Sequence, residues 1–200
     1  MTLTGGLVPE GIIWDGVYTS AGTVFTVDNL GGLGAPPLAN SSRAGITIAA
    51  SDVSINNLII ANFTHGISIE DSSDTDISDV IIIRTQDTGI SITSSDGVTI
   101  SESTIIGKDT TGTGILIEET ASSVQLLSTQ DNNSSVVNCD VGISVAGDDV
   151  SIDAVTVSWS THDGISVTAT ASDFISANNI LFNNGGNGIQ VSGLTSGINK

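Results

Sequence analysis

The phrase Gly66-Ile67-Ser68-Ile69 occurs, with small variations, seven times along the 200 residues of the chain. A fixed phrase that returns at nearly regular intervals is typical of a solenoid, in which each unit buries its apolar side against its neighbours. The repeat therefore indicates the architecture before any other feature does. Copies of the pattern Gly-Ile-x-Ile/Val begin at Gly45, Gly66, Gly89, Gly114, Gly142, Gly164 and Gly188, at intervals of 21, 23, 25, 28, 22 and 24 residues.

Each repeat contains two further short apolar runs after this phrase. A turn rich in Ser and Asp leads to a second run such as Val53-Ser54-Ile55, and a third run such as Leu58-Ile59-Ile60 follows two residues later. Apolar and polar residues alternate in the first two runs, which predicts strands with one buried face. Equivalent strands keep one direction, because no two-residue hairpin turn separates them. The sequence predicts an all-β, parallel β-helix of about eight coils and three sheets, about 40 Å long at roughly 4.8 Å per coil.

The chain divides into an irregular N-terminal part, residues 1–44, and one continuous set of repeats, residues 45–200. Residues 28–44 contain Gly-Gly and Pro-Pro without periodicity, which predicts an ordered excursion that lies on the body of the rod. We expect Trp14 and Phe25 to cover the N-terminal end of the core. The glycine that opens each phrase is expected at a corner, where the backbone needs either a positive φ or a close approach to another chain segment.

Acidic residues dominate the charge, with 22 Asp and Glu against four Lys and Arg and a net charge of −18. Such a chain lacks the basic stripe that would neutralise phosphates, so we expect no binding to nucleic acid. No apolar stretch reaches membrane-spanning length, and we expect no membrane insertion. The composition favours a protein of an extracellular, cell or virion surface. The single cysteine, Cys139, is predicted to be a buried, inert thiol.

Residues 45–69, GITIAASDVSINNLIIANFTHGISI, resemble the right-handed parallel β-helix repeats of the pectin-lyase-like superfamily. The resemblance extends over about residues 45–193 and implies the same fold. Pectate lyases, polygalacturonases, phage tailspikes and cell-surface proteins share this scaffold. The resemblance therefore leaves the function open, because one fold supports several unrelated activities.

The third run of each repeat does not alternate, and it places apolar residues in its outward slot. An exposed apolar row is typical of a covered surface or an interface. We expect the row to be an interface between copies of the chain, or to be covered by residues 28–44. The residues predicted for this row are Ile59, Ile81 and Leu181, with Thr104 and Thr156 continuing it less cleanly.

An acidic row lies in the turn before the second run of nearly every repeat. Asp suits such turns because its side chain accepts hydrogen bonds from nearby backbone N–H groups. Stacked carboxylates are also candidate ligands of Ca²⁺, which takes several oxygen ligands in flexible geometry. The expectation is therefore either no cofactor or calcium. The candidate ligands are Asp52, Asp74, Asp96, Asp148 and Asp149.

The resemblance implies two kinds of active site, and the sequence meets neither fully. Lyases of the superfamily use Ca²⁺ on Asp residues with an Arg or Lys base, and Arg84 beside Asp87 is the only mid-rod candidate. Hydrolases use carboxylates as general acid and base, and Asp148-Asp149 loosely resembles their Gly-Asp-Asp element. The accompanying His65 precedes this pair, the reverse of the family order, and the Asn-Thr-Asp and Arg-Ile-Lys elements are absent.

The sequence thus favours a non-catalytic structural or adhesive rod, in a surface protein, filament or virion appendage. Self-association through the ends or the third sheet would make it a homo-oligomer or filament. The alternative is a polysaccharide lyase or glycoside hydrolase, or a carbohydrate-binding rod. In that alternative, the candidate platform for stacking a sugar is Trp159.

Overall fold

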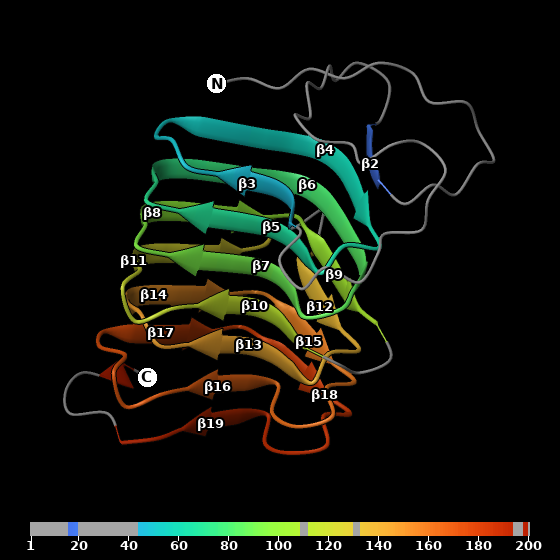
Figure 1. Cartoon of the computed structure of the whole chain (residues 1–200). Helices are drawn as coiled ribbons and strands as arrows, with labels where there is room; N and C mark the ends of the chain where they lie inside the picture. The colour runs from blue at the N-terminus through green and yellow to red at the C-terminus, as the bar shows by residue number, and fades with distance from the viewer. Residues whose placement is uncertain (1–15, 20–43, 109–111, 130–132, 194–197, 200) are drawn as a thin grey trace.

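The computed structural model describes residues 16–19, 44–108, 112–129, 133–193 and 198–199 (Figure 1). The repeats form a stack of coils around one apolar core, and the described residues contain no helix long and apolar enough to cross a membrane. Trp14, Phe25 and the predicted excursion up to residue 43 lie outside the described residues.

The Gly-Ile-x-Ile phrases form one seven-stranded parallel sheet, as predicted. Identical positions stack in register, so that Ile67 pairs with Ile90, and Ile90 pairs with Ile115. Seven stacked strands correspond to about six full turns, fewer than the eight coils expected. The strands are β3 (Ala44–Ile48), β5 (His65–Glu70), β7 (Thr88–Thr93), β10 (Thr113–Ile117), β13 (Val141–Val145), β16 (Ile165–Val167) and β19 (Ile189–Val191).

The second and third runs share one sheet, instead of forming the two separate sheets that were predicted. The strands β4 (Val53–Ala61) and β6 (Ser73–Thr85) pass through the bend between the two runs and so join them. At this bend Asn57 and Asp79 have φ values of 57° and 52°, a left-handed conformation that Asn and Asp tolerate well. The second runs continue as β8 (Asp96–Ser101), β11 (Ser122–Leu127), β14 (Asp148–Asp153), β17 (Phe174–Ala177) and β20 (Ile198–Asn199), and the third as β9 (Thr104–Gly107), β12 (Ser135–Val137), β15 (Thr156–Ser158) and β18 (Ile180–Phe182).

One strand departs from the parallel stack. The strand β2 (Gly16–Thr19) pairs antiparallel with β4, with Tyr18 opposite Ile59. It thereby occupies the outer edge of the larger sheet at the N-terminal end of the rod. An unpaired edge is a template for association with other strands, so this pairing protects the edge.

Columns of isoleucine and valine fill the interior, and each contributes roughly 1.5–3 kcal/mol through burial of its side chain. Ile69, Ile92 and Ile117 are fully buried in one such column. Polar residues at the corners maintain hydrogen bonding where the strands are interrupted. The Ser103 hydroxyl accepts a hydrogen bond from the N–H of Val80 (3.2 Å) and donates one to the carbonyl of Ser101 (2.8 Å). Adjacent coils thus remain bonded at a buried corner, where unpaired backbone groups would be costly.

The glycine that opens each phrase is required by close packing, not by a positive φ. A Cβ atom on Gly89 would lie 2.4 Å from the carbonyl oxygen of Gly114 and 2.4 Å from Cγ2 of Ile105. Gly66, Gly114 and Gly142 have equally close contacts. Gly188 differs, because its nearest neighbour, Leu181, is 3.5 Å away and leaves room for a methyl group. The phrase therefore begins with glycine because the first strand lies directly against the next coil.

Replacing Gly89 by Ala is expected to lower the free energy of unfolding by about 1–3 kcal/mol, because the added methyl group overpacks the interior. The matched control Gly188→Ala should change it by no more than about 0.5 kcal/mol. Chemical denaturation followed by circular dichroism measures both. Equal effects of the two substitutions would contradict this explanation of the repeated glycine.

Candidate functional site

The four catalytic candidates are not brought together. Arg84 lies near the end of β6, and Asp87 lies in the turn that leads to β7. Asp148 and Asp149 begin β14, beyond the opposite end of the first-strand sheet and two coils further along. Arg84 itself has a φ of 59° and lies at the corner where Asn62 has a φ of 63°. The corner thus accounts for the position of Arg84. Among the described residues, no acid–base pair forms between Arg84 or Asp87 and the pair Asp148-Asp149.

Both histidines face an aspartate of a neighbouring coil. Nδ1 of His162 lies 2.7 Å from Oδ1 of Asp140, and both side chains are exposed. Nδ1 of His65 lies 3.8 Å from Oδ2 of Asp87, a longer contact that leaves this nitrogen buried without a hydrogen bond. His65 is the first residue of β5, whereas His162 lies in a turn two residues before Gly164. Their partners lie on opposite sides, one coil later for His65 and one coil earlier for His162.

The acidic row consists of two adjacent columns. Asp96 and Asp148 occupy one column, but both pair with Ser122, so that a hydroxyl separates the two carboxylates. Ser122 Oγ donates to Asp96 at 2.8 Å, and Ser172 Oγ donates to Asp148 at 2.8 Å. Hydrogen bonds from Ser122 and then Ser123 hold the pKa of Asp96 below its ordinary value. In this column each carboxylate is thus stabilised by serine.

The second column contains Asp52, Asp74 and Asp149, with φ values of 57°, 54° and 51°. Asp52 directly precedes β4, and Asp74 and Asp149 are the second residues of β6 and β14, where the corner needs the left-handed conformation. Gly97 occupies the same place in its coil and has a φ of 67°. The turn therefore accounts for aspartate at these positions. No three His, Cys, Asp or Glu side chains of the described ranges are grouped so that they could hold a metal ion, and calcium binding stays a prediction.

The apolar row on the third face is present, but one of its predicted members is wrong. Ile59 and Ile81 pair in the outward slot and are 38% and 40% exposed. Leu181 instead pairs with Val157 in the inward column and packs against the core. The outward residue of that coil is Ile180, which is 58% exposed.

The shift in the last coil has a physical reason. Asn179 takes the place that Leu58 holds in the first coil, and its Oδ1 accepts a hydrogen bond from the N–H of Val155 (2.8 Å). The three apolar residues that follow are therefore displaced by one position relative to Leu58-Ile59-Ile60. A displacement of one residue moves every side chain of a strand to the opposite face.

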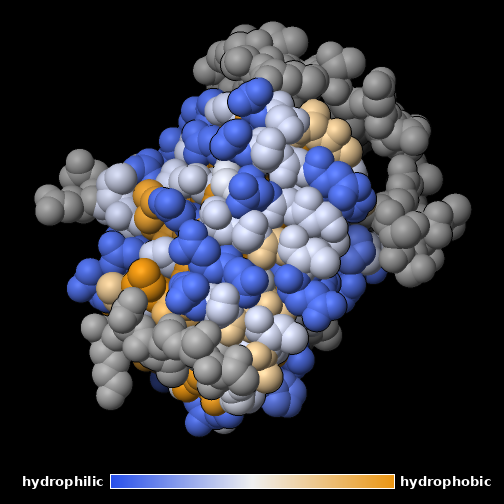
Figure 2. Space-filling model, turned by 90° about the vertical axis from the view of Figure 1, so that its left-hand side faces the viewer, coloured by the Kyte–Doolittle hydropathy of each residue, from blue (hydrophilic) through white to orange (hydrophobic). Residues whose placement is uncertain are grey.

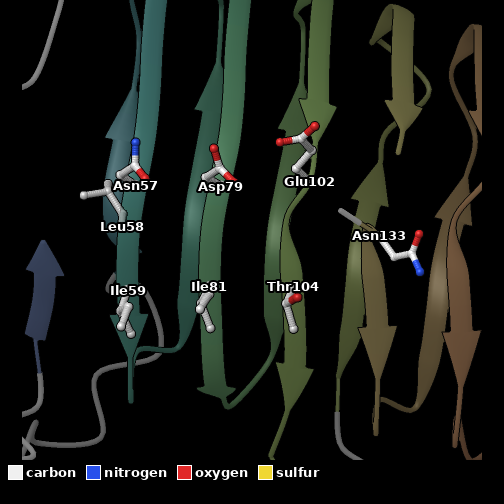
Figure 3. Close-up of a pocket in the computed structure, with 8 residues that line it drawn as sticks. All are labelled: Asn57, Leu58, Ile59, Asp79, Ile81, Glu102, Thr104 and Asn133. Atoms are coloured by element: carbon white, nitrogen blue, oxygen red, sulfur yellow. The ribbon is translucent and has the colours of Figure 1, made fainter. Parts of the chain in front are cut away.

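A shallow groove of about 330 Å³ runs over the bend between the second and third runs (Figure 3). Asn57, Asp79 and Glu102 form a polar row across three coils, and Asn133 lies at its far end. Ile59, Ile81 and Thr104 form a parallel, more apolar row. The Glu102 carboxylate accepts a hydrogen bond from the Thr129 hydroxyl at 2.5 Å.

Sequence reasoning missed the polar row of this groove. Each of its first three residues stands two positions before an outward residue of the third run, so the repeat spacing was a signal that could have found them. All three have positive φ values of 50–57°, which turns the chain at the bend. The bend thus fixes the positions of the polar row and of the apolar row that follows it, so that the two rows lie side by side.

A second apolar surface covers the C-terminal coils. Nine large hydrophobic residues among those described are exposed, and six of them follow residue 158: Trp159, Ile175, Ile180, Phe182, Ile189 and Val191. Figure 2 looks onto the corner between the first and second runs, where orange residues lie along one edge and toward the lower, C-terminal coils. Trp159 is 56% exposed at a corner with a φ of 59°, and its role as a sugar platform stays a prediction. Ile189 and Val191 thus expose inward columns that the earlier coils bury, whereas Ile180 and Phe182 continue outward positions that are also exposed at Ile81 and Ile106.

Cys139 is buried against Gly107 of the preceding coil, as predicted. Burial raises the pKa of its thiol to about 11, because the apolar interior disfavours the thiolate. The thiol is therefore protonated at neutral pH.

Cys139 is expected to resist a maleimide or aromatic disulfide reagent at pH 8 in the folded protein, because the reactive thiolate is both scarce and inaccessible. Denaturation should expose one reactive thiol per chain. Mass spectrometry after timed labelling measures this, with the denatured protein as the control. Rapid labelling of the native protein would show that the corner around Cys139 opens readily.

Comparison with known proteins supports the fold alone. The family described as a right handed beta helix region matches residues 38–131. A search of curated proteins finds no match. The matched range includes most of the groove of Figure 3 and ends before the apolar C-terminal coils.

Proposed function

Since the chain is a right-handed parallel β-helix repeat protein, we propose that it serves as a structural or adhesive rod that associates with other copies of itself. The observation that carries this proposal is the exposed apolar surface, which runs along the third face at Ile59, Ile81 and Ile106 and over the C-terminal coils. Large exposed apolar patches mark interaction sites, because soluble proteins otherwise bury such surface.

The distribution of charge supports association at these surfaces. Residues 70–173 contain 18 of the 22 carboxylates, the other four being Glu10, Asp15, Asp28 and Asp52. Contact through the acidic corners would bring like charges together, whereas contact through apolar residues removes hydrophobic surface from water. An acidic exterior with few lysines suits a rod in a filament, an appendage or a cell or virion surface, where it remains soluble between its contacts.

The full chain is expected to self-associate, because its apolar surface has no partner within the described part of the chain. Analytical ultracentrifugation over micromolar to millimolar concentrations should show a sedimentation coefficient that rises with concentration and persists at high salt, since hydrophobic contacts are not screened. A chain that sediments as a monomer over the whole range would overturn the proposal.

The groove of Figure 3 favours a second function, the binding of a glycan. Amide and carboxylate groups beside an apolar row suit the hydroxyl groups and the apolar face of a sugar ring. Asp79 and Glu102 lie on adjacent coils, and a pair of carboxylates is the group that glycoside hydrolases use. The groove would then be the site of a carbohydrate-binding or polysaccharide-processing rod.

Binding of uronate-containing and neutral oligosaccharides, with and without calcium, tests this second function. Glycan-array binding and assays for new reducing ends or unsaturated products are the measurements. If the groove is used, the double variant Asp79→Asn with Glu102→Gln should lose at least about tenfold in affinity, or 1.4 kcal/mol. The distant control Asp153→Asn should bind like the unchanged protein. If the unchanged protein neither binds nor cleaves any sugar in the screen, the sugars tested are excluded as its ligands and substrates.

A further inference from the structure

The outward side of the third face carries no charge along its length. Its strands are the ends of β4 and β6 together with β9, β12, β15 and β18, and their outward residues stack in two rows. One row runs from Ile59 to Ile180 and the other from Ala61 to Phe182, and no residue paired in either row is Asp, Glu, Lys, Arg or His. Of the nine large hydrophobic residues exposed in the described part of the chain, five lie here: Ile59, Ile81, Ile106, Ile180 and Phe182.

The two edges of this face differ in charge. Asp79 and Glu102 lie at the edge that precedes the third run, in line with Asn57 and beside the apolar row (Figure 3). Arg84 lies at the opposite edge, where it directly follows Ile83 and is exposed. One edge of the face is therefore acidic, and the other carries a cation at the same level of the rod.

The cations of the described residues are confined to the second edge. Arg84 and Lys108 are the only Lys and Arg in the part of the chain that the structure describes, and both come within two residues of the outward rows. No carboxylate directly follows a third run. Asp87 and Asp140 lie further along the turns, where each faces a histidine of a neighbouring coil. The face thus has an uncharged centre between edges of opposite sign.

We propose that two copies of the chain pair through their third faces about a two-fold axis parallel to the rod. The rods then lie side by side, point in the same direction and have equivalent coils at the same level. This inference rests on the proposed self-association and names its contact surface and geometry. The rotation reverses the strand direction, so it places the acidic edge of one copy against the basic edge of the other. Asp79 then faces Arg84 of the second copy, and the pair occurs twice because the contact is isologous.

The order of residues along the face favours the same arrangement. With equivalent coils at one level, Ile81 meets Ile83 of the other copy, Ile180 meets Phe182, and Thr156 meets a serine hydroxyl. A copy turned end for end would instead place the coil of Ile81 against the coil of Thr156. It would also bring the two acidic edges together, and two carboxylates at about 4 Å repel by roughly 1 kcal/mol in water. Apolar and charge complementarity therefore select the same orientation.

The size of the face sets the strength of the contact. About four residues and six strands, at roughly 3.3 Å and 4.8 Å each, give a footprint of roughly 400 Å², below the roughly 800 Å² per partner of a stable complex. We therefore expect a weak dimer, formed between micromolar and millimolar concentrations. Exposed ion pairs add little affinity, so the apolar rows hold the copies together and the edges determine their orientation.

Exchange of the edge charges tests the orientation. Asp79→Arg and Arg84→Asp are each expected to weaken the dimer about fivefold at low salt, because each places like charges opposite one another twice. The two positions have φ values of 52° and 59°, so each replacement side chain already occurs in this conformation in the chain. An equimolar mixture of the two variants, and the double variant, should recover the original affinity in sedimentation equilibrium.

A second carboxylate of the same coil provides the control. Asp76→Arg changes the net charge equally on the outward side of the second run and should not weaken the dimer. If Asp79→Arg strengthens association and the mixture shows no recovery, the acidic edges face one another and the proposed orientation is wrong.

Apolar substitutions separate this inference from the function on which it rests. Ile81 and Ile175 are 40% and 41% exposed, on the third and second faces. Ile81→Glu should weaken association at least tenfold, and Ile175→Glu should leave it unchanged, with circular dichroism showing both variants folded. Association that Ile81→Glu does not weaken would overturn the proposed contact and retain self-association through another surface. A monomeric unchanged protein would exclude both, and if Ile81→Cys then resists a maleimide, residues 28–44 cover the face instead.

Discussion

The contact between the first strand of each coil and the coil that follows determines the rest of the structure. The opening glycine of the phrase lies so close to the next carbonyl that no Cβ atom fits, and this closeness keeps successive coils in exact parallel register. Because the coils are in register, equivalent side chains of successive coils lie on top of one another. Inward isoleucines therefore form buried columns, and outward residues form rows on the surface. The apolar row, the acidic columns and the groove are such rows, and their chemistry follows from which residues share a column.

The corners impose a second constraint, because at most of them one residue of the coil adopts a positive φ. Asn and Asp meet this need at low cost, which accounts for most of the acidic residues that could otherwise be taken for metal ligands. The same constraint places Asn57, Asp79 and Glu102 beside the apolar row and so creates the groove. A residue selected for backbone conformation can therefore also supply a surface chemistry, and the two roles occur at one position.

The ends of a solenoid present the opposite situation to its middle. Within the stack each coil covers the next, whereas Ile189 and Val191 have described core neighbours on one side only. The strand β2 pairs antiparallel with the N-terminal edge of the larger sheet, and residues 174–193 contain six amide side chains and no charged one. The coils after residue 158 therefore carry six of the nine exposed large hydrophobic residues among those described, whereas the middle coils are acidic.

The sequence by itself determined the parallel β-helix, its inward columns and the outward positions of Ile59 and Ile81, because a strand period of two and a fixed repeat length are local properties that the chain displays directly. It did not determine the number of turns, the fusion of two faces into one sheet, or the place of Leu181, which depends on Asn179 taking a core position by bonding to a neighbouring coil. Only the tertiary structure separated Arg84 and Asp87 from Asp148 and Asp149, interposed Ser122 between Asp96 and Asp148, and revealed the groove. These arrangements depend on which residues of different coils become neighbours. The register and the corners decide this, and neither is specified by the spacing of residues along the chain.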